Sequence, residues 1–221
     1  MTAPHLSDGL DIEANLAKYV GNLRADARYA SFDYCFNYFQ THRESGTVTA
    51  LAEGANMEVS CLQLGFYLAS WGMLRGSSVL LQRSVRHFRG VVSSIASLPA
   101  EAWQIDANDY STAACDLLLD TGRRIRSALD VHASDILVTK IMLGVLGCVP
   151  AFDTNFKRGF RNASTFGLAS LRRIAEFYES NAELIDRHRL PTMDFETGQP
   201  TARLYTRAKV IDMIFFIEGE Q

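Results

Sequence analysis

Residues 134–161 read SDILVTKIMLGVLGCVPAFDTNFKRGFR, and this stretch decides the fold that we expect for the chain. Ser134 is a favourable helix cap, and the apolar residues behind it follow helical spacing, interrupted by Lys140. Pro150 cannot continue a helix, so the chain has to turn before Asp153. We therefore predict a helix ahead of the turn and a candidate site at the turn. A basic run follows it: Lys157, Arg158 and Arg161.

The composition is that of a globular protein. The chain has 221 residues, of which 48% are hydrophobic and 21% are charged. This length fits one domain, so we expect residues 1–221 to form a single helical domain. The net charge is −3, and binding of nucleic acid would therefore need a local basic patch. The chain shows neither a run of eighteen apolar residues nor a signal-peptide pattern at its start, so we expect a cytoplasmic protein without a membrane partner.

The cysteines and histidines do not form a metal-binding pattern. The four cysteines lie far apart within apolar runs, which predicts buried, reduced thiols instead of a zinc site. The histidines offer no pair at helical spacing, and the sequence contains neither a phosphate-loop nor a dinucleotide fingerprint. We therefore expect no metal and no cofactor.

Apolar residues recur at spacings of three and four, which predicts an all-α fold of eight or nine helices without a sheet of three or more strands. The expected helices cover residues 11–25, 31–42, 57–71, 77–98, 106–129, 134–146, 164–187 and 203–217. Asp106 or Asp109 should cap the fifth of these, and Ser164 or Thr165 the seventh. Residues 190–201 should form a loop with a turn at 197–200. The helices 57–71 and 134–146 are apolar on nearly all sides and should be central.

Lys140 and Asp153 are the candidate catalytic residues. A lysine withdrawn from water loses its proton more readily and can act as a nucleophile or base, whereas a lysine on an outer face is solvated. Asp153 is expected to cap a helix, and a capping carboxylate at a loop can also face a pocket. On capping alone, Asp153→Asn should change stability by less than about 1 kcal/mol, because Asn also caps well.

Residues 71–78, WGMLRGSS, form a second candidate region. Gly72 and Gly76 allow the backbone to approach a ligand closely. If a helix begins at Ser77, its free amides and Arg75 would form an anion site; the alternative is a plain turn. Trp71 should be buried and structural. The candidate substrate-binding residues are Trp71, Arg75, Lys157 and Arg158.

The segment from Lys140 to Arg158 resembles the active-site region of the helix-hairpin-helix DNA glycosylases. In that superfamily a helical hairpin precedes a Pro-x-Asp-Thr-His segment with a catalytic aspartate, and residues 149–156 here read VPAFDTNF. The resemblance implies DNA as the partner, a catalytic Asp153 and, as in bifunctional members, a Schiff-base role for Lys140. The chain departs from the pattern by one extra residue before the aspartate, by a hairpin reduced to Gly144 and Gly147, and by a lysine closer to the acid.

Three stretches, one of them overlapping this segment, also resemble uncharacterised bacterial proteins, which implies no activity. They are FYLASWGMLRGSS at 66–78, TKIMLGVLGCVPAFD at 139–153 and YTRAKVIDMIFFIEG at 205–219.

The sequence leaves three functions open. The first is a nucleic-acid-acting enzyme of the DNA glycosylase type. The second is a non-catalytic helical module that binds a partner or forms a homodimer through an aromatic face. The third is a ribonuclease of the HEPN type, because Arg126 and His132 match the Arg-x5-His spacing of that family, with Ser127 as the polar residue after the arginine.

Overall fold

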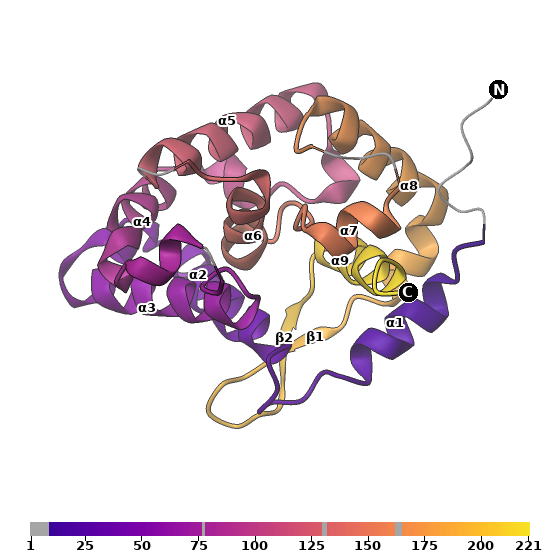
Figure 1. Ribbon diagram of the computed structural model, residues 1–221, viewed down its shortest axis with the longest axis horizontal. Helices are drawn as coiled ribbons and strands as arrows, with labels where there is room; N and C mark the ends of the chain where they lie inside the picture. The colour runs from indigo at the N-terminus through magenta and orange to yellow at the C-terminus, as the bar shows by residue number, and fades with distance from the viewer. Residues whose placement is uncertain (1–8, 77, 130–131, 162–164) are drawn as a thin grey trace.

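The computed structural model describes residues 9–76, 78–129, 132–161 and 165–221. Within them the chain is helical and forms one globular unit (Figure 1), which confirms the predicted all-α class. The α-helices of these residues are α1 (Ile12–Val20), α2 (Ala30–Glu44), α3 (Gly54–Ser70), α4 (Arg89–Ala96), α5 (Thr112–Ala128), α6 (Asp135–Leu146), α7 (Thr154–Gly159), α8 (Leu168–Arg187) and α9 (Arg207–Glu218). The strands β1 (Pro191–Met193) and β2 (Pro200–Leu204) pair antiparallel and are the whole of the sheet formed by the described residues.

Helices α6 and α9 are the centre of the fold. Every residue of α6 from Leu137 to Leu146 is buried, and so is every residue of α9 from Ala208 to Ile217. Helix α6 packs against α2, α3 and α5, and α9 is enclosed by α1, α7 and α8 (Figure 1). The predicted central position of residues 134–146 is thus confirmed, and α9 is the second central helix.

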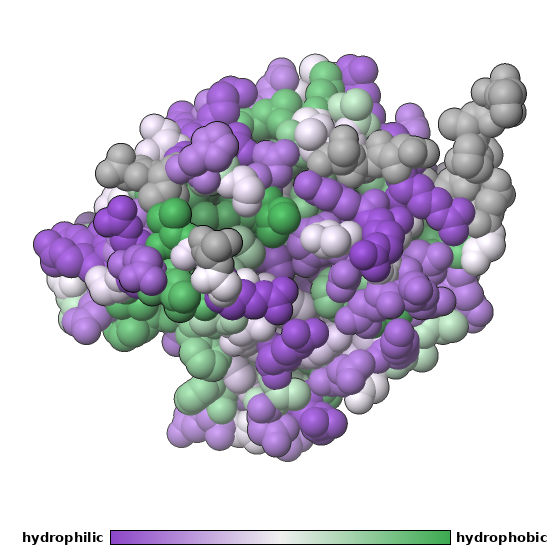
Figure 2. Space-filling model, in the orientation of Figure 1, coloured by the Kyte–Doolittle hydropathy of each residue, from purple (hydrophilic) through white to green (hydrophobic). Residues whose placement is uncertain are grey.

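Helix α3 is only partly buried, so the central position predicted for residues 57–71 is wrong. Val59, Leu62 and Phe66 are 40%, 48% and 69% exposed. Their spacing places them on one face of the helix. Figure 2 shows hydrophobic residues gathered over this part of the molecule. An apolar helix surface does not by itself reveal whether another element covers it, which is why the sequence did not distinguish this face.

The single helix predicted over residues 77–98 is interrupted. Ser77 lies outside the described residues, and two 3-10 turns, Val79–Gln82 and Val85–Phe88, precede α4. The backbone between the turns is extended at Arg83 and Ser84, with ψ of 143° and 166°. This break brings the second turn onto Gly65 of α3, where the side chains of Val85 and Phe88 occupy the space beside a residue without a Cβ. Leu81, in the first of the two turns, is 50% exposed.

Asp106 caps a different helix from the expected one. Ser111 caps α5, whereas the Asp106 carboxylate accepts the backbone N–H groups of Arg207 and Ala208 at 2.8 Å each. A carboxylate at a helix N-terminus satisfies free amides and complements the helix dipole. Asp106 therefore fixes the start of central helix α9 from far away in the sequence. Helix α8 also starts later than predicted: Ser164 lies outside the described residues, and Gly167 instead of Thr165 precedes Leu168.

A β-hairpin takes the place of part of the predicted loop at 190–201. Strand β2 extends to Leu204, so α9 begins at Arg207, later than expected, with Thr206 as its cap. The hairpin is anchored on α2 by Asp33, which accepts the Met193 N–H at 2.8 Å and the Tyr205 hydroxyl at 2.7 Å.

The cysteines follow the prediction. All four are free and buried: Cys35, Cys61, Cys115 and Cys148. Burial raises the pKa of each thiol above its ordinary value, which suppresses the reactive thiolate.

Helices α7 and α9 cross at very short range because glycines stand at the crossing. A Cβ on Gly159 would overlap the Phe215 carbonyl, and a Cβ on Gly219 would overlap the Asn155 carbonyl. Backbone cannot yield as a flexible side chain can, so this crossing fixes the position of α7 and, with it, of Asp153 at the start of α7.

We expect Gly159→Ala to lower the free energy of unfolding by about 3 kcal/mol, because the added methyl group forces two backbones apart. Gly167→Ala is the matched control: its Cβ would meet no atom within 4 Å, and its φ of −169° is ordinary extended backbone. Urea unfolding measures both variants. Equal midpoints for the two would contradict the tight crossing.

Asp33 gives the fold a pH dependence. Burial raises the pKa of its carboxyl from 3.8 to about 6, although hydrogen bonds from Tyr205 and Met193 and the charge of Lys209 oppose the shift. The folded protein thus holds this proton more tightly than the unfolded chain does. The contribution of Asp33 to stability should therefore fall, by on the order of 2–3 kcal/mol, as the pH rises from 3.8 to about 6.

The measurement is urea unfolding across that pH interval, with Asp33→Asn as the control. The variant has no carboxyl at this position, so the difference in unfolding free energy between the two proteins should change with pH. A constant difference would show that Asp33 titrates alike in both states.

Candidate functional site

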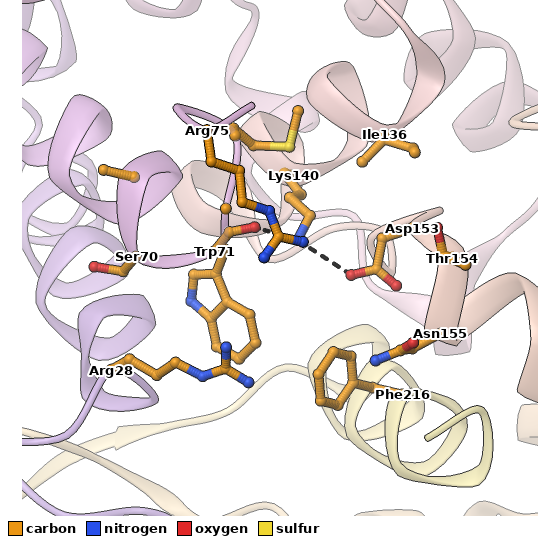
Figure 3. Close-up of a pocket in the computed structure, with 13 residues that line it drawn as sticks. Arg28, Ser70, Trp71, Arg75, Ile136, Lys140, Asp153, Thr154, Asn155 and Phe216 are labelled. Carbon is orange, nitrogen blue, oxygen red and sulfur yellow. Dashed lines mark hydrogen bonds and ion pairs between the residues drawn. The ribbon is translucent and has the colours of Figure 1, made fainter. Parts of the chain in front are cut away.

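A cavity of about 490 Å³ lies among α3, α6, α7 and α9 and contains both candidate catalytic residues (Figure 3). Four residues singled out from the sequence line it: Trp71, Arg75, Lys140 and Asp153. Trp71 and Arg75 come from the turn after α3, Lys140 from α6 and Asp153 from the start of α7. The helical fold therefore brings these four residues to one place.

Lys140 points into the protein toward this cavity, so the interpretation of an outward, solvated lysine is wrong. The residue is 4% exposed. Its Nζ lies 3.1 Å from Asp153 Oδ2 and donates a hydrogen bond to the Trp71 carbonyl at 3.2 Å. Asp153 caps α7 with its other oxygen, Oδ1, which accepts the Phe156 N–H at 3.0 Å. Asp153 thus acts as a helix cap and faces the cavity at once.

The turn between α6 and α7 sets Asp153 opposite Lys140. Helix α6 ends at Leu146, and the next residue, Gly147, has a left-handed φ of 67°, which suits glycine. After Pro150 the backbone is held from two sides. The Ala151 N–H donates to Asp212 Oδ1, and the Phe152 N–H donates to Thr139 Oγ1, each at 2.9 Å.

Trp71 is half-buried, which corrects the expectation of a fully buried residue. Its ring meets the edges of Tyr29 and Phe216, with centroids 5.3 and 5.6 Å away. Three cations approach the same ring: Arg28 at 5.3 Å, Lys140 at 5.5 Å and Lys209 at 5.6 Å. These distances lie within cation–π range, so Trp71 holds positive charge beside the cavity.

Arg28 and Arg75 bring two guanidinium groups to the mouth of the cavity, where both residues are exposed (Figure 3). Arg75 folds back over Gly72, where a Cβ would lie 2.9 Å from Arg75 Nε, and the φ of Gly72 is 77°. Within the described part of the chain, the two guanidinium groups have no hydrogen-bond acceptor and no carboxylate partner. Their donors are therefore available to a ligand.

The cavity is locally positive. Its lining contains Arg28, Arg75 and Lys140 against one carboxylate, that of Asp153. The chain as a whole carries a net charge of −3. Positive charge in a concave site attracts anions more strongly than the same charge on an open surface, because the low-dielectric walls focus the field.

The basic run after Asp153 does not join this site. Arg158 donates to the Gly219 carbonyl at 3.0 Å, and Lys157 is half-buried along α7. Arg158 follows Asp153 by five positions, about 140° around the helix, and so lies on another face. Thr154 and Asn155 line the cavity in their place.

The predicted anion site at a helix starting with Ser77 is not formed by the described residues. Ser77 lies outside them, and the next residue, Ser78, caps a four-residue 3-10 turn.

Arg126 of the Arg-x5-His pair donates to the Ala133 carbonyl and pairs with Asp135, whereas His132 is exposed ahead of α6.

A buried ion pair that the sequence patterns did not predict lies behind the cavity. Lys209 and Asp212 of α9 are 1% and 6% exposed, and Lys209 Nζ lies 2.9 Å from both Asp212 Oδ2 and the Tyr19 hydroxyl. Burial lowers the pKa of the Lys209 ammonium, but Asp212 and Tyr19 outweigh this and raise it above its ordinary value. The sequence does contain an indication of this pair, because two opposite charges stand at i and i+3 in a helix that is otherwise almost entirely apolar.

Among the described residues, no three His, Cys, Asp or Glu side chains converge as a metal site would require. None of the helices that these residues form has the length and apolar character needed to cross a membrane.

No protein-family model matches the chain, and neither does any curated protein or solved structure.

The buried position of Lys140 changes what we expect of Asp153→Asn. The cap is kept, but the buried ammonium loses its carboxylate, which should lower the free energy of unfolding by about 2–4 kcal/mol, more than capping alone suggests. Replacing both partners in Lys140→Met/Asp153→Asn should recover most of this loss. Denaturant unfolding of the two variants decides: if the single variant is as stable as the wild type, the ion pair contributes nothing.

Proposed function

We propose that the cavity binds nucleic acid and that Lys140 and Asp153 carry out base-excision chemistry of the DNA glycosylase type. One observation carries the proposal: a lysine and an aspartate lie 3.1 Å apart inside a cavity whose other charged residues are arginines. The arrangement unites a nucleophile, a proton acceptor and an anion-binding mouth.

Binding would use the mouth and the aromatic wall. Arg28 and Arg75 carry planar guanidinium groups, which can bind phosphate through two parallel hydrogen bonds. Trp71 and Phe216 supply aromatic surface beside them, as single-stranded or flipped bases require. A volume of about 490 Å³ lies within the range of small-molecule sites and suits one nucleotide drawn out of its strand.

The chemistry would begin with the Lys140 amine, which becomes nucleophilic once its proton has left. Asp153 is the acceptor for that proton. The amine attacks C1′ of the deoxyribose, and the bond to the base breaks with its electron pair leaving on the base. The adduct nitrogen then loses a proton to the departed base, the C1′–O4′ bond breaks with its electron pair on O4′, and O4′ takes the proton held by Asp153. A protonated Schiff base between Lys140 and C1′ remains.

Borohydride trapping tests this chemistry directly. Wild-type protein mixed with a duplex that contains an abasic site should form a covalent adduct after reduction. Lys140→Ala should give none, because no other amine lines the cavity among the described residues. Arg124→Ala is the control, since Arg124 lies on α5 in an exposed pair with Asp120. An adduct that persists in Lys140→Ala would remove Lys140 from the mechanism.

Binding can be measured apart from chemistry by fluorescence anisotropy with the same duplex. Arg28→Ala and Arg75→Ala should each weaken binding and reduce the slope of log affinity against log salt by about 1, as expected for the loss of one phosphate contact. Arg124→Ala should leave both quantities unchanged. Equal effects of all three variants would indicate non-specific attraction instead of binding at the cavity.

A non-catalytic interaction module is the second candidate, and the exposed face of α3 favours it. Phe66 is 69% exposed beside Leu62 and Val59, which is unusual for a large aromatic residue. A second copy of the chain could cover this face. The trapping experiment separates the two candidates, because a module that uses only this surface forms no covalent adduct.

A further inference from the structure

The buried ion pair of α9 contacts both walls of the cavity. Lys209 and Asp212 lie almost completely out of water and 2.9 Å apart. Taking two charges out of water is costly, and an apolar pair of similar size would serve stability as well or better. The other contacts of these two side chains therefore indicate why the pair is charged.

Asp212 holds the turn that carries Asp153. Its Oδ1 accepts the N–H of Ala151, two residues before Asp153, at 2.9 Å. The N–H of Phe152, one residue before Asp153, donates to Thr139 Oγ1 at the same distance. The two backbone N–H groups just before Asp153 thus donate to buried side chains of different helices, α9 and α6. Thr139 is also the neighbour of Lys140 in α6, so the two halves of the candidate catalytic pair are tied together.

Lys209 supports the other wall. Its Nζ lies 5.6 Å from the centre of the Trp71 ring and donates to the Tyr19 hydroxyl at 2.9 Å. The Trp71 carbonyl is the second hydrogen-bond acceptor of Lys140. One ion pair therefore lies behind both groups that hold the Lys140 ammonium, the Asp153 carboxylate and the Trp71 carbonyl.

We infer that Asp212 and Thr139 are positioning residues that fix the Asp153 carboxylate against Lys140, and that Lys209 orients Asp212. The catalytic consequence rests on the function proposed above. The physical reason is the sensitivity of proton transfer to distance: a displacement of about 1 Å at a reacting group can cost on the order of a hundredfold in rate. Without their acceptors the two amides would seek other partners, and the turn would lose its single conformation.

Two matched pairs of variants isolate the acceptor from charge and volume. Lys209→Met/Asp212→Asn removes both charges but keeps an oxygen for the Ala151 amide, whereas Lys209→Met/Asp212→Leu removes the charges and the oxygen. In the same way, Thr139→Ser keeps an oxygen for the Phe152 amide and Thr139→Val does not. Thermal unfolding first identifies conditions under which both variants of a pair are equally stable and folded. The two variants are then compared under those conditions.

The first readout is the rate of adduct formation on saturating abasic duplex, measured beside the dissociation constant. The variants without the oxygen should react about 10–100-fold more slowly, and their dissociation constants should stay near the wild-type value, because Asp212 and Thr139 lie outside the binding mouth. Their partners with the oxygen should regain most of the rate. Equal rates within each pair would overturn the positioning role while leaving the proposed function in place.

The second readout does not depend on activity. Acetylation of Lys140 in the native protein, followed by mass spectrometry, reports how firmly Asp153 and the Trp71 carbonyl hold the ammonium. The variants without the oxygen should be acetylated several-fold faster than their partners. If the wild type forms no adduct, the proposed function fails, and this measurement alone decides the positioning role. Equal acetylation within the pairs would overturn it. If the Leu variant does not fold, the Thr139 pair gives the answer.

Discussion

The hydrogen bond between the Asp212 carboxylate and the Ala151 amide joins the two central helices of this protein to its cavity. Asp212 lies in α9, and Ala151 lies in the turn that connects α6 to α7. Because α9 is enclosed on its other sides, the turn is fixed relative to a helix that cannot move independently. The start of α7 and the position of Asp153 follow from this contact and from the glycine crossing of α7 and α9.

Aromatic rings gather positive charge at the cavity, in addition to the carboxylates that pair with Lys140 and Lys209. Trp71 meets three cations, and Lys209 also lies 4.8 and 4.7 Å from the centres of the Tyr19 and Phe32 rings. A ring face attracts a cation without cancelling its charge, whereas a carboxylate neutralises it. The mouth thus keeps a positive field in a chain of negative net charge, which is the property that an anionic ligand requires.

The apolar face of α3 and the polar cavity are two chemically different surfaces of one fold. Val59, Leu62 and Phe66 offer a surface without charge, whereas Arg28 and Arg75 offer hydrogen-bond donors at a concave mouth. Of these two surfaces, the cavity is the one with groups that could take part in bond making, Lys140 and Asp153. This difference is why the enzyme-type function is the first proposal and the interaction module the second.

The sequence by itself determined the helical class, the caps Ser134 and Asp153, and the buried thiols, because periodicity, capping and local apolar context act within a few turns of chain. It also marked four of the lining residues of the cavity. Only the tertiary structure decided that Lys140 points inward, that Asp106 caps α9, that the helix after Ser77 is broken, and that Lys209 and Asp212 lie behind Trp71. Each of these depends on which distant element covers a given face, and that is settled by packing between helices, which local spacing does not encode.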